Sequence, residues 1–551
     1  MAEIRQAKEE IKEKINQADS AEKETKEEKT VSKEQERDEL HRAIWGIADQ
    51  LRGSVDGWDF KSYVLGIMFY RYISENLVEY LNANEIAAGY PDFDYAELSD
   101  EKAESDREEI VQTKGFFIRP SELFCNVRKR AAGDENLNVT LGNVFRHIEE
   151  SARGHESEDD FSGLFADIDV NSPKLGATVA KRNANLVNLL DGVGDMKLGK
   201  YQENTIDAFG DAYEYLMGMY ASNAGKSGGE FFTPQDVSEL LTRLAVGKKK
   251  EISKVYDPAC GSGSLLLKAA KILGKNHVRE GFYGQEINIT TYNLCRINMF
   301  LHDIDYDKFD IANEDTLTAP QHGDDEPFEV IVSNPPYSLN WEGDTNPVLI
   351  NDPRFSPAGV LAPKSKADFA FIMHSLAWLA DNGTAAIVCF PPILDRTNHK
   401  AEKKIRQYLV DNNFVDCIIQ LPDNLFYGTT IATCIMVLKK QKEDRTVLFI
   451  DASGEFVKVS KNNRLTENNI RRIVEAYMAR EEIAHFSYKA DWKEVKENGY
   501  NLSVSTYVEP EDTREIIDIG TLNQEIQTIV AREQVLREKI DRIIAEIEGN
   551  V

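Results

Sequence analysis

Paired cysteines, clustered histidines and long apolar runs are all missing from this sequence. Its six cysteines are scattered over 551 residues without a CxxC pair, and its nine histidines form no HExxH motif. We therefore expect no metal site and no disulfide framework, and the reducing cytoplasm as the compartment. No apolar run is long enough to cross a bilayer and the N-terminus is charged, so we expect neither a signal peptide nor a membrane partner.

Positive charge is also scarce. The chain has 65 basic and 94 acidic side chains, which gives a formal net charge of −29. Tight, unaided binding to DNA usually depends on a basic surface that neutralises phosphates. The balance argues against such binding, but it is compatible with a local basic groove or with a partner that reads DNA.

Composition and apolar spacing divide the chain into four predicted segments. Residues 1–37 are mostly Glu, Lys, Gln, Ala and Ser and form a charged tail, either disordered or a solvated helix. Residues 38–220 carry apolar side chains at helical spacing and predict a helical N-terminal domain without a catalytic constellation. Strands and helices alternate in residues 221–480, the predicted catalytic domain, and residues 481–551 form a C-terminal extension.

Short apolar runs in the third segment predict a parallel β-sheet of the α/β class. Each run is three to seven residues long and is bounded by turn residues or by a helical pattern. The predicted strands are Lys254–Tyr256, Phe282–Gln285, Phe328–Val332, Ala385–Phe390, Val415–Gln420, Ala432–Leu438 and Val447–Ile450.

Residues 512–548 have the apolar repeat of a coiled coil. Apolar side chains recur at alternating steps of three and four, and Glu533 fills one position of the seam. A helix that docks on a partner subunit fits this pattern, and the alternative is a surface helix packed on its own domain. The seam consists of Leu522, Ile526, Ile529, Leu536, Ile540, Ile543 and Ile547.

The stretch Ser-Asn-Pro-Pro-Tyr at 333–337 ends the strand predicted before it. Two consecutive prolines cannot continue a β-ladder, so the chain leaves the sheet at its carboxyl edge, where ligands bind in open α/β sheets. The amide oxygen of Asn334 and the carbonyl of Pro335 can accept from an exocyclic amine, and the ring of Tyr337 can stack on a nucleobase. The alternative is a tight loop in which Asn334 is a turn residue and Tyr337 fills the core.

A glycine loop follows the first predicted strand. Residues 257–264 read Asp-Pro-Ala-Cys-Gly-Ser-Gly-Ser and open a helix, whose N-terminus offers free N–H groups. The third glycine of the dinucleotide-binding pattern is absent, since Leu266 takes its place. Asp257, just before the loop, supplies a carboxylate that can receive an ammonium group.

Two further acids lie at successive strand ends. Glu286 stands where an acid commonly binds ribose hydroxyls, and Asp315 is placed to accept from an adenine amine. Each acid alone is equally compatible with a solvated loop, but in this order they match a ligand with an amino-acid group, a ribose and an adenine. That ligand is S-adenosyl-L-methionine. The predicted fold is a Rossmann-like methyltransferase sheet, preceded by a helical domain and followed by a coiled-coil-like helix.

The segment Gly-Gly-Glu-Phe-Phe-Thr-Pro-Gln-Asp at 228–236 leads into an apolar helix. Thr233 fits as the N-cap, Pro234 lies in the first helical turn, and Asp236 fits as the acid of a capping box. This capping role accounts for Thr233 and Pro234, but it does not explain the two adjacent phenylalanines.

Together, these motifs resemble the N6-adenine DNA methyltransferases, and most closely the modification (M) subunit of type I restriction–modification systems. The resemblance rests on GGEFFTP, DPACGSG, GQE, EDT and NPPY, with Leu51-Arg52-Gly53, the stretch 64–69 and Ala-Asp-Phe-Ala-Phe at 367–371. It covers about residues 38–480.

The resemblance implies a role for each motif. Asn334, Pro335, Pro336 and Tyr337 would hold and stack on a flipped adenine, and Phe426 would cover the other face of the base, although Tyr427 is the alternative. Asn334 would also lie against S-adenosyl-L-methionine. The other cofactor-binding residues would be Glu230, Phe231, Phe232, Thr233, Pro234, Gln235, Asp257, Gly261, Ser262, Gly263, Ser264, Glu286 and Asp315.

The resemblance also implies partners. The substrate would be double-stranded DNA, read by a separate specificity (S) subunit that two copies of the M subunit flank, and a motor–nuclease (R) subunit would join for cleavage. This chain is not the motor, because Tyr220 stands where the Gly-Lys-Ser at 225–227 would need a glycine for a phosphate-binding loop.

Other functions remain open from the sequence. One is a self-sufficient adenine methyltransferase, which would need a basic target-reading domain that we do not find. Another is a non-catalytic S-adenosylmethionine-binding scaffold, against which the intact NPPY argues. A protein methyltransferase also uses an NPPY-like site, and the length and helical N-terminal domain favour DNA over protein as the substrate.

Overall fold

The computed structural model describes residues 33–51, 57–197, 212, 215–216, 233–343, 346–426, 429–459, 462–510 and 519–549. Several residues discussed above lie outside these ranges: Gly225, Lys226, Ser227, Glu230, Phe231, Phe232 and Tyr427. The chain separates after Val508 into a large unit and a small C-terminal unit, and each is described by itself.

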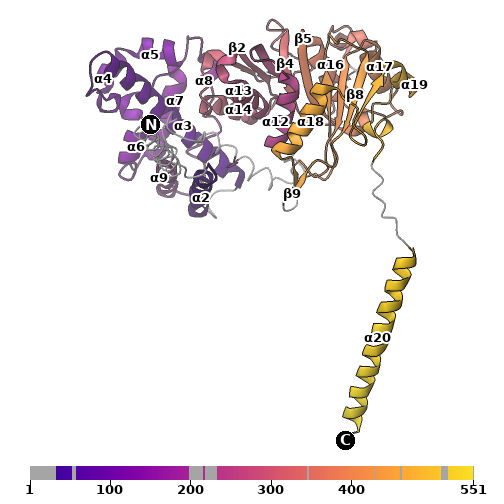
Figure 1. Ribbon diagram of the computed structural model, residues 1–551. Helices are drawn as coiled ribbons and strands as arrows, with labels where there is room; N and C mark the ends of the chain where they lie inside the picture. The colour runs from indigo at the N-terminus through magenta and orange to yellow at the C-terminus, as the bar shows by residue number, and fades with distance from the viewer. Residues whose placement is uncertain are drawn as a thin grey trace, which may run out of the picture. The chain divides into compact units, whose positions relative to one another are not determined.

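A nine-stranded sheet forms the centre of the large unit, in the order β11-β8-β6-β7-β5-β4-β1-β2-β3 (Figure 1). Neighbouring strands are parallel, except that β7 runs antiparallel to β5 and β6, and β11 runs antiparallel to β8. The strands are β1 Ile252–Asp257, β2 Val278–Gln285, β3 Phe309–Ala312, β4 Phe328–Ser333, β5 Leu379–Cys389, β6 Val415–Gln420, β7 Cys434–Leu438, β8 Thr446–Asp451 and β11 Ser487–Asp491.

The predicted α/β sheet is confirmed, and each of the seven predicted strands has a counterpart. Strands β3 and β11 were not predicted, and neither was the small antiparallel pair β9 (Val457–Val459) and β10 (Asn462–Arg464). The domain boundary predicted at residue 480 was wrong, because β11 lies beyond it and still belongs to the main sheet, where it pairs with β8. Its sequence, Ser-Tyr-Lys-Ala-Asp, lacks the apolar run of an inner strand because it lies at the sheet edge.

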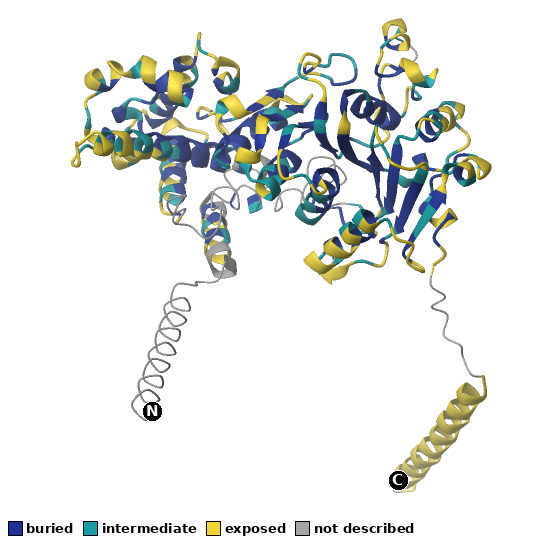
Figure 2. Ribbon diagram, turned by 45° about the horizontal axis from the view of Figure 1, so that its top comes forward, coloured by how far each residue is buried: buried dark blue, intermediate teal, exposed yellow. Residues whose placement is uncertain are grey.

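The two faces of the sheet pack into two separate hydrophobic clusters, as the alternation of side chains along a strand requires. In β1, Val255 belongs to one cluster and Tyr256 to the other. Helices on the first face are α12 Gln235–Val246, α13 Ser264–Leu273, α14 Ile289–Leu301 and α18 Glu467–Ala479. Those on the second are α16 Asp368–Trp378, α17 Lys400–Asp411 and α19 Trp492–Glu497. The strands between these layers are largely buried (Figure 2).

The N-terminal part is helical, as predicted. Its first described helix begins at Lys33, inside the segment predicted to be a charged tail. The longer helices are α2 Lys33–Leu51, α3 Gly57–Ala87, α5 Arg107–Lys114, α6 Phe124–Ala131, α7 Leu137–Ser151 and α9 Val179–Gly194, with the short α4 Asp100–Glu104 and α8 Glu158–Phe161.

These helices share a core with the first face of the sheet. The ring of Phe300 on α14 lies 5.9 Å from that of Phe69 and 5.0 Å from that of Phe161, between centroids. Next to them, the buried guanidinium of Arg296 donates to the carbonyl oxygens of Asp159 and Ser162. The helical part is therefore joined to α14 by both apolar packing and buried hydrogen bonds.

The C-terminal unit consists of one long helix, α20 (Ile519–Glu548). Every residue of this helix is exposed, including the predicted seam, where Ile529 and Ile547 are each 65% exposed (Figure 2). None of the helices that the structure describes has the length and apolar character of a membrane span.

Candidate active site

The strand order places the predicted site at the point where the sheet changes direction. The chain runs outward from β1 to β2 and β3, and then returns to β4 on the other side of β1. In open α/β sheets, ligands bind outside the carboxyl ends of the strands at such a point. Here the carboxyl end of β1 is Asp257, which leads into the glycine loop, and that of β4 is Ser333, which leads into Asn334.

Asn334 is held from two sides. Its Nδ2 donates to Oγ1 of Thr233 at 3.1 Å, and its Oδ1 accepts from the hydroxyl of Tyr337 at 2.6 Å. The amide is therefore oriented by a residue of its own loop and by one from the segment that precedes α12. The structure thus brings Asn334 of the NPPY motif together with Thr233 of the GEFFTP motif.

The capping role expected for Thr233 was wrong. Helix α12 begins at Gln235, its N-cap is Pro234, and no side chain caps it. Oδ2 of Asp236 instead accepts from the backbone N–H of Leu465. The Thr233 hydroxyl is buried and accepts a hydrogen bond from Asn334. The orientation of the Thr233 side chain therefore depends on a tertiary contact, which a helix-capping pattern does not predict.

Tyr337 is half-buried, with its ring 6.4 Å from that of Phe390 at an interplanar angle of 24°. Burial raises the pKa of its hydroxyl well above the ordinary value, so the hydroxyl is a proton donor at neutral pH. The group that touches Asn334 therefore does not act as a base.

The residue after Tyr337 has a backbone conformation that L-residues rarely adopt. Ser338 has φ of +52°, and its N–H points to the carboxylate of Asp368, 3.2 Å from Oδ2. Asp368 is the buried first residue of α16, and burial raises the pKa of its carboxyl. Asp368 belongs to the Ala-Asp-Phe-Ala-Phe motif at 367–371, and its contact with Ser338 in the loop after β4 was not predicted.

The glycine loop is packed closely against α14. At Gly263 the backbone has φ of +80°, and a Cβ there would lie 2.8 Å from the sulfur of Cys295. Ser262 is buried, and its carbonyl accepts from Asn298 at 2.8 Å, while Ser264 begins α13. The N-terminus of α13 has no side-chain cap, which leaves its N–H groups available to a ligand.

Asp257 lies at the end of β1 and is fully buried. Its Oδ1 accepts from the backbone N–H of Ala259 at 3.0 Å, and among the described residues Oδ2 has no hydrogen-bond partner. Burial raises the pKa of this carboxyl to about 7, against the opposing effects of the Ala259 amide and the nearby Ser333 hydroxyl. A buried carboxylate whose Oδ2 makes no hydrogen bond within the usual geometric limits can accept the ammonium group of S-adenosylmethionine.

The loops that follow β1, β2 and β3 are tied to one another. Glu286, after β2, accepts from the backbone N–H of Gly261 at 3.1 Å and from that of Asn288 at 2.8 Å. Asn313, after β3, donates to the carbonyl of Glu286, and Thr316 donates to that of Pro258. Burial raises the pKa of Glu286.

Asp315 is placed at the third of these strand ends but serves its own loop. Its Oδ1 accepts from the N–H of Leu317 and its Oδ2 from the hydroxyl of Thr318, both at 2.9 Å. Arg354, which the sequence analysis did not single out, is buried and donates to the carbonyls of Thr316 and Leu317. Only the fold brings this arginine, about 40 residues along the chain, under the loop.

Phe426 is only 2% exposed and belongs to the same hydrophobic cluster as the first face of the sheet. In this conformation its ring presents no open face to a base. Tyr427, the alternative, lies outside the described residues. The remaining predicted residues, Pro335 and Pro336, follow Asn334 directly, and Pro335 is buried.

Known protein families match both the helical and the α/β part of this chain. The family described as N-6 DNA Methylase matches residues 204–516, and the family described as HsdM N-terminal domain matches residues 40–193. The methylase subunit of the type I restriction enzyme MpnII from Mycoplasma pneumoniae is 50% identical, over 93% of this chain and 97% of its own length.

Solved structures show the same similarity. The type I restriction–modification methyltransferase subunit from Streptococcus thermophilus is 36% identical, with a TM-score of 0.76, and the match covers 86% of this chain and 100% of that one. A chain from a structural study of type I complex assembly has a TM-score of 0.60 at 18% identity, over 92% of this chain and 99% of its own length, and so shows the shared fold.

Proposed function

Because this chain belongs to the N-6 DNA methylase family, as a type I restriction enzyme methylase subunit that uses S-adenosylmethionine, we propose that it methylates N6 of an adenine turned out of the DNA duplex. We further propose that a separate specificity subunit selects the target sequence. The observation that supports this most directly is the fixed amide of Asn334 at the carboxyl end of β4.

Asn334 would orient the adenine amine. When bound, S-adenosylmethionine supplies an electrophilic methyl group, so the chain's task is to align the amine and to stabilise the positive charge it gains. Oδ1 of Asn334 already accepts one hydrogen bond from Tyr337, and a carbonyl oxygen has two lone pairs. Oδ1 can therefore accept a hydrogen bond from the amine while it keeps the one from Tyr337. The carbonyl of Pro335 would be the second acceptor for the amine.

The cofactor would lie along the three tied loops. Asp257 would receive its ammonium group, and Glu286 its ribose hydroxyls, with the N-terminus of α13 and the backbone of the glycine loop beside them. The buried, unpartnered Oδ2 of Asp257 supports this placement. The remaining contacts from Glu230 to Gln235 and from Asp315 stay predictions.

The charge of the chain and the exposed seam of α20 support the proposed partners. A net charge of −29 disfavours unaided binding to DNA. The apolar seam of α20 is exposed, and such a seam favours packing against another helix that removes it from water. We assign α20 to docking on the specificity subunit, in a complex with two M subunits and one S subunit that a motor–nuclease subunit joins. Residues 38–220 would be the helical domain, and the catalytic domain would run from residue 221 through β11.

The test is methyl transfer from labelled S-adenosylmethionine to duplex DNA, with and without a specificity subunit of a type I system from the same organism. Label in N6-methyladenine only with both proteins would support the proposal. Label with this chain alone would favour a self-sufficient methyltransferase, and label in protein would change the substrate class.

The matched variants are Asn334→Ala and Asn340→Ala. Asn340 is exposed in the same loop and has no proposed role. Asn334→Ala should abolish transfer while cofactor binding persists, and Asn340→Ala should retain full activity. Methylation at the wild-type rate by Asn334→Ala would sink the assignment.

A further inference from the structure

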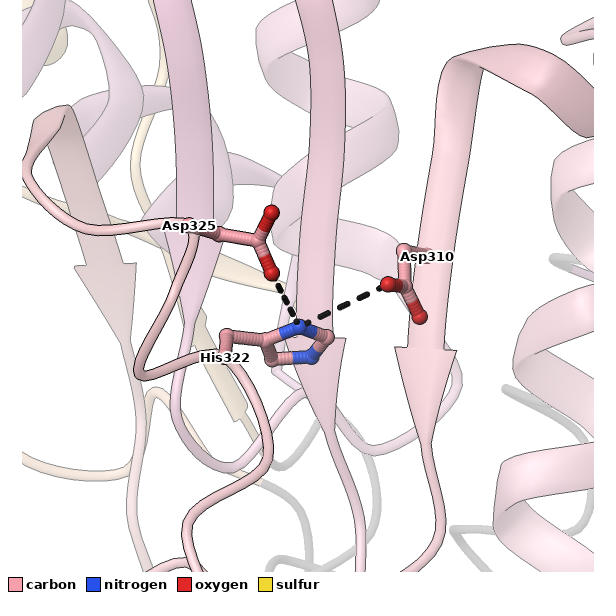
Figure 3. Close-up of side chains that lie close together, drawn as sticks. All are labelled: Asp310, His322 and Asp325. Carbon is pink, nitrogen blue, oxygen red and sulfur yellow. Dashed lines mark ion pairs between the residues drawn. The ribbon is translucent and has the colours of Figure 1, made fainter.

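Three ligand-type side chains meet on the methyltransferase sheet apart from the residues assigned above. They are Asp310 of β3, and His322 and Asp325 of the loop between β3 and β4 (Figure 3). Nδ1 of His322 lies 3.4 Å from Oδ2 of Asp325 and 3.7 Å from Oδ2 of Asp310. One potential ligand atom from each residue lies within 4.8 Å of the other two.

The imidazole of His322 is fixed by the opposite nitrogen. Nε2 lies 2.9 Å from the carbonyl oxygen of Gly284, and a carbonyl can only accept, so Nε2 carries the proton. In the neutral ring, Nδ1 then has a lone pair, and this lone pair faces two carboxylates. Metal-binding histidines are commonly oriented in this way, with the distal N–H donated to a backbone carbonyl.

The ring is also held by its surroundings. His322 is only 2% exposed, and its ring packs edge-on against Tyr283, with 5.5 Å between the centroids. Asp310 and Asp325 are 60% and 33% exposed, so the cluster is buried on the histidine side and open to solvent on the carboxylate side. This arrangement leaves room for water ligands.

Negative charge around the cluster exceeds what His322 can balance. Two carboxylates, those of Asp310 and Asp325, flank its single imidazole. Lys254 donates to the backbone carbonyl of Asp325 and pairs with Glu280 at 3.6 Å.

We propose that Asp310, His322 and Asp325 bind one divalent transition-metal cation of the Zn²⁺ or Mn²⁺ type. One imidazole and two carboxylates suit such ions, and ligand atoms about 3.4 Å apart match bonds of about 2.1 Å at a tetrahedral centre. Solvent completes the coordination. No metal site was predicted, because the sequence has no CxxC pair and no HExxH motif. Asp310, His322 and Asp325 are spaced by 12 and 3 positions, which matches neither pattern.

The site anchors the β3–β4 loop. This loop begins beside Asp315 and ends at β4, and its Gln321 N–H donates to the side chain of Gln285 at 3.1 Å. A cation shared by β3 and the loop fixes the segment that connects the predicted cofactor contact with the strand leading to Asn334. The cation takes no part in methyl transfer, so this proposal is independent of the proposed function.

The experiment is a titration of the full-length, tag-free, chelator-treated chain with Zn²⁺ by calorimetry and with Co²⁺ by its visible absorption. We expect saturable uptake of one equivalent, a rise in Tm with cation concentration, and weaker binding of Mg²⁺, which prefers oxygen ligands. Asp310→Asn should weaken the affinity for Zn²⁺ at least about tenfold. Asp310 is largely exposed, so this variant should fold.

Asp324→Asn is the matched control, since Asp324 is exposed in the same loop but outside the cluster. It should bind Zn²⁺ as the wild type does, and His322→Gln should lose binding. No saturable uptake by the wild type would overturn the proposal. Equal affinity in the Asp310→Asn variant would overturn it as well.

Discussion

The Nδ2 group of Asn334 donates to the hydroxyl of Thr233 at 3.1 Å, across 101 positions of sequence. This bond fixes which way the amide faces, because the nitrogen points to Thr233 and the oxygen points to Tyr337. The proposed acceptor for the adenine amine is thereby oriented by the fold itself. The conformation of the NPPY loop consequently depends on a residue of the segment before α12.

Replacing Thr233 by valine should slow methyl transfer. The change keeps the shape of the side chain but removes the acceptor, and a buried hydrogen bond contributes about 1 kcal/mol, so kcat should fall about fivefold. Thr233→Ser keeps the hydroxyl and should retain most of the activity. The measurement is steady-state kinetics, and a full kcat in the valine variant would contradict the role of this bond.

Replacing Tyr337 separates the ring from its hydroxyl. Tyr337→Phe keeps the stacking surface and loses only the bond to Asn334, so activity should fall less than about tenfold. Tyr337→Ala also loses stacking on the base, worth about 1–3 kcal/mol, and should lower kcat/KM for DNA by about tenfold or more. Equal rates in the two variants would show that the ring does not contact the base.

Binding of S-adenosylmethionine should depend on pH through Asp257. The pKa of this carboxyl is raised to about 7, so it is mostly protonated at pH 6 and mostly ionised at pH 8. An ammonium group binds the ionised form, so affinity should rise about tenfold from pH 6 to pH 8. Calorimetry in buffers of different ionisation enthalpy would also detect the proton released on binding.

Asp257→Asn is the control for that titration. It should bind the cofactor weakly at both pH values and lose most of the dependence, although Glu286, whose pKa is also raised, will still titrate. Without ligand, the effect of Asp257 on the free energy of unfolding has the opposite pH dependence: it favours low pH. The raised pKa of Asp257 means that the folded state holds its proton more tightly, so its contribution to stability is full below pH 4 and is lost as pH rises to about 7.

Charge on the seam of α20 should abolish docking without unfolding the large unit. Ile529 and Ile540 are 65% and 55% exposed, so aspartate at either position removes no buried contact. We expect loss of co-purification with the specificity subunit and an unchanged Tm. Gln527→Asp, off the seam, should assemble normally. Assembly of the Ile529→Asp and Ile540→Asp double variant at wild-type affinity would exclude α20 as the docking helix.

Inner strands were readable from the sequence because they are largely buried on both faces and are therefore mostly apolar. Phe328–Ser333 is a clear case, followed after Asn334 by two prolines that prevent it from continuing. Strands β3 and β11 were missed because they are the two outermost strands of the sheet and carry polar residues such as Asp310 and Lys489. Edge strands need fewer apolar side chains, which removes the signal.

The sequence by itself determined the local features of this protein. These are the alternation of strands and helices, the glycine loop with left-handed Gly263, the break at Asn334 and the apolar seam of α20. Each follows from steric limits or side-chain periodicity within about 20 residues, which a sequence displays directly.

Only the tertiary structure decided which of these features meet. The strand order brings Asp257 and Asn334 to one edge, Thr233 to Asn334, and Arg354 beneath the loop of Asp315. It also buries Phe426 and turns Nδ1 of His322 toward two carboxylates. Most of these contacts join residues far apart in the sequence, up to the 101 positions between Thr233 and Asn334. Their energies arise from packing and desolvation of the whole fold, so no local pattern in the sequence specifies them.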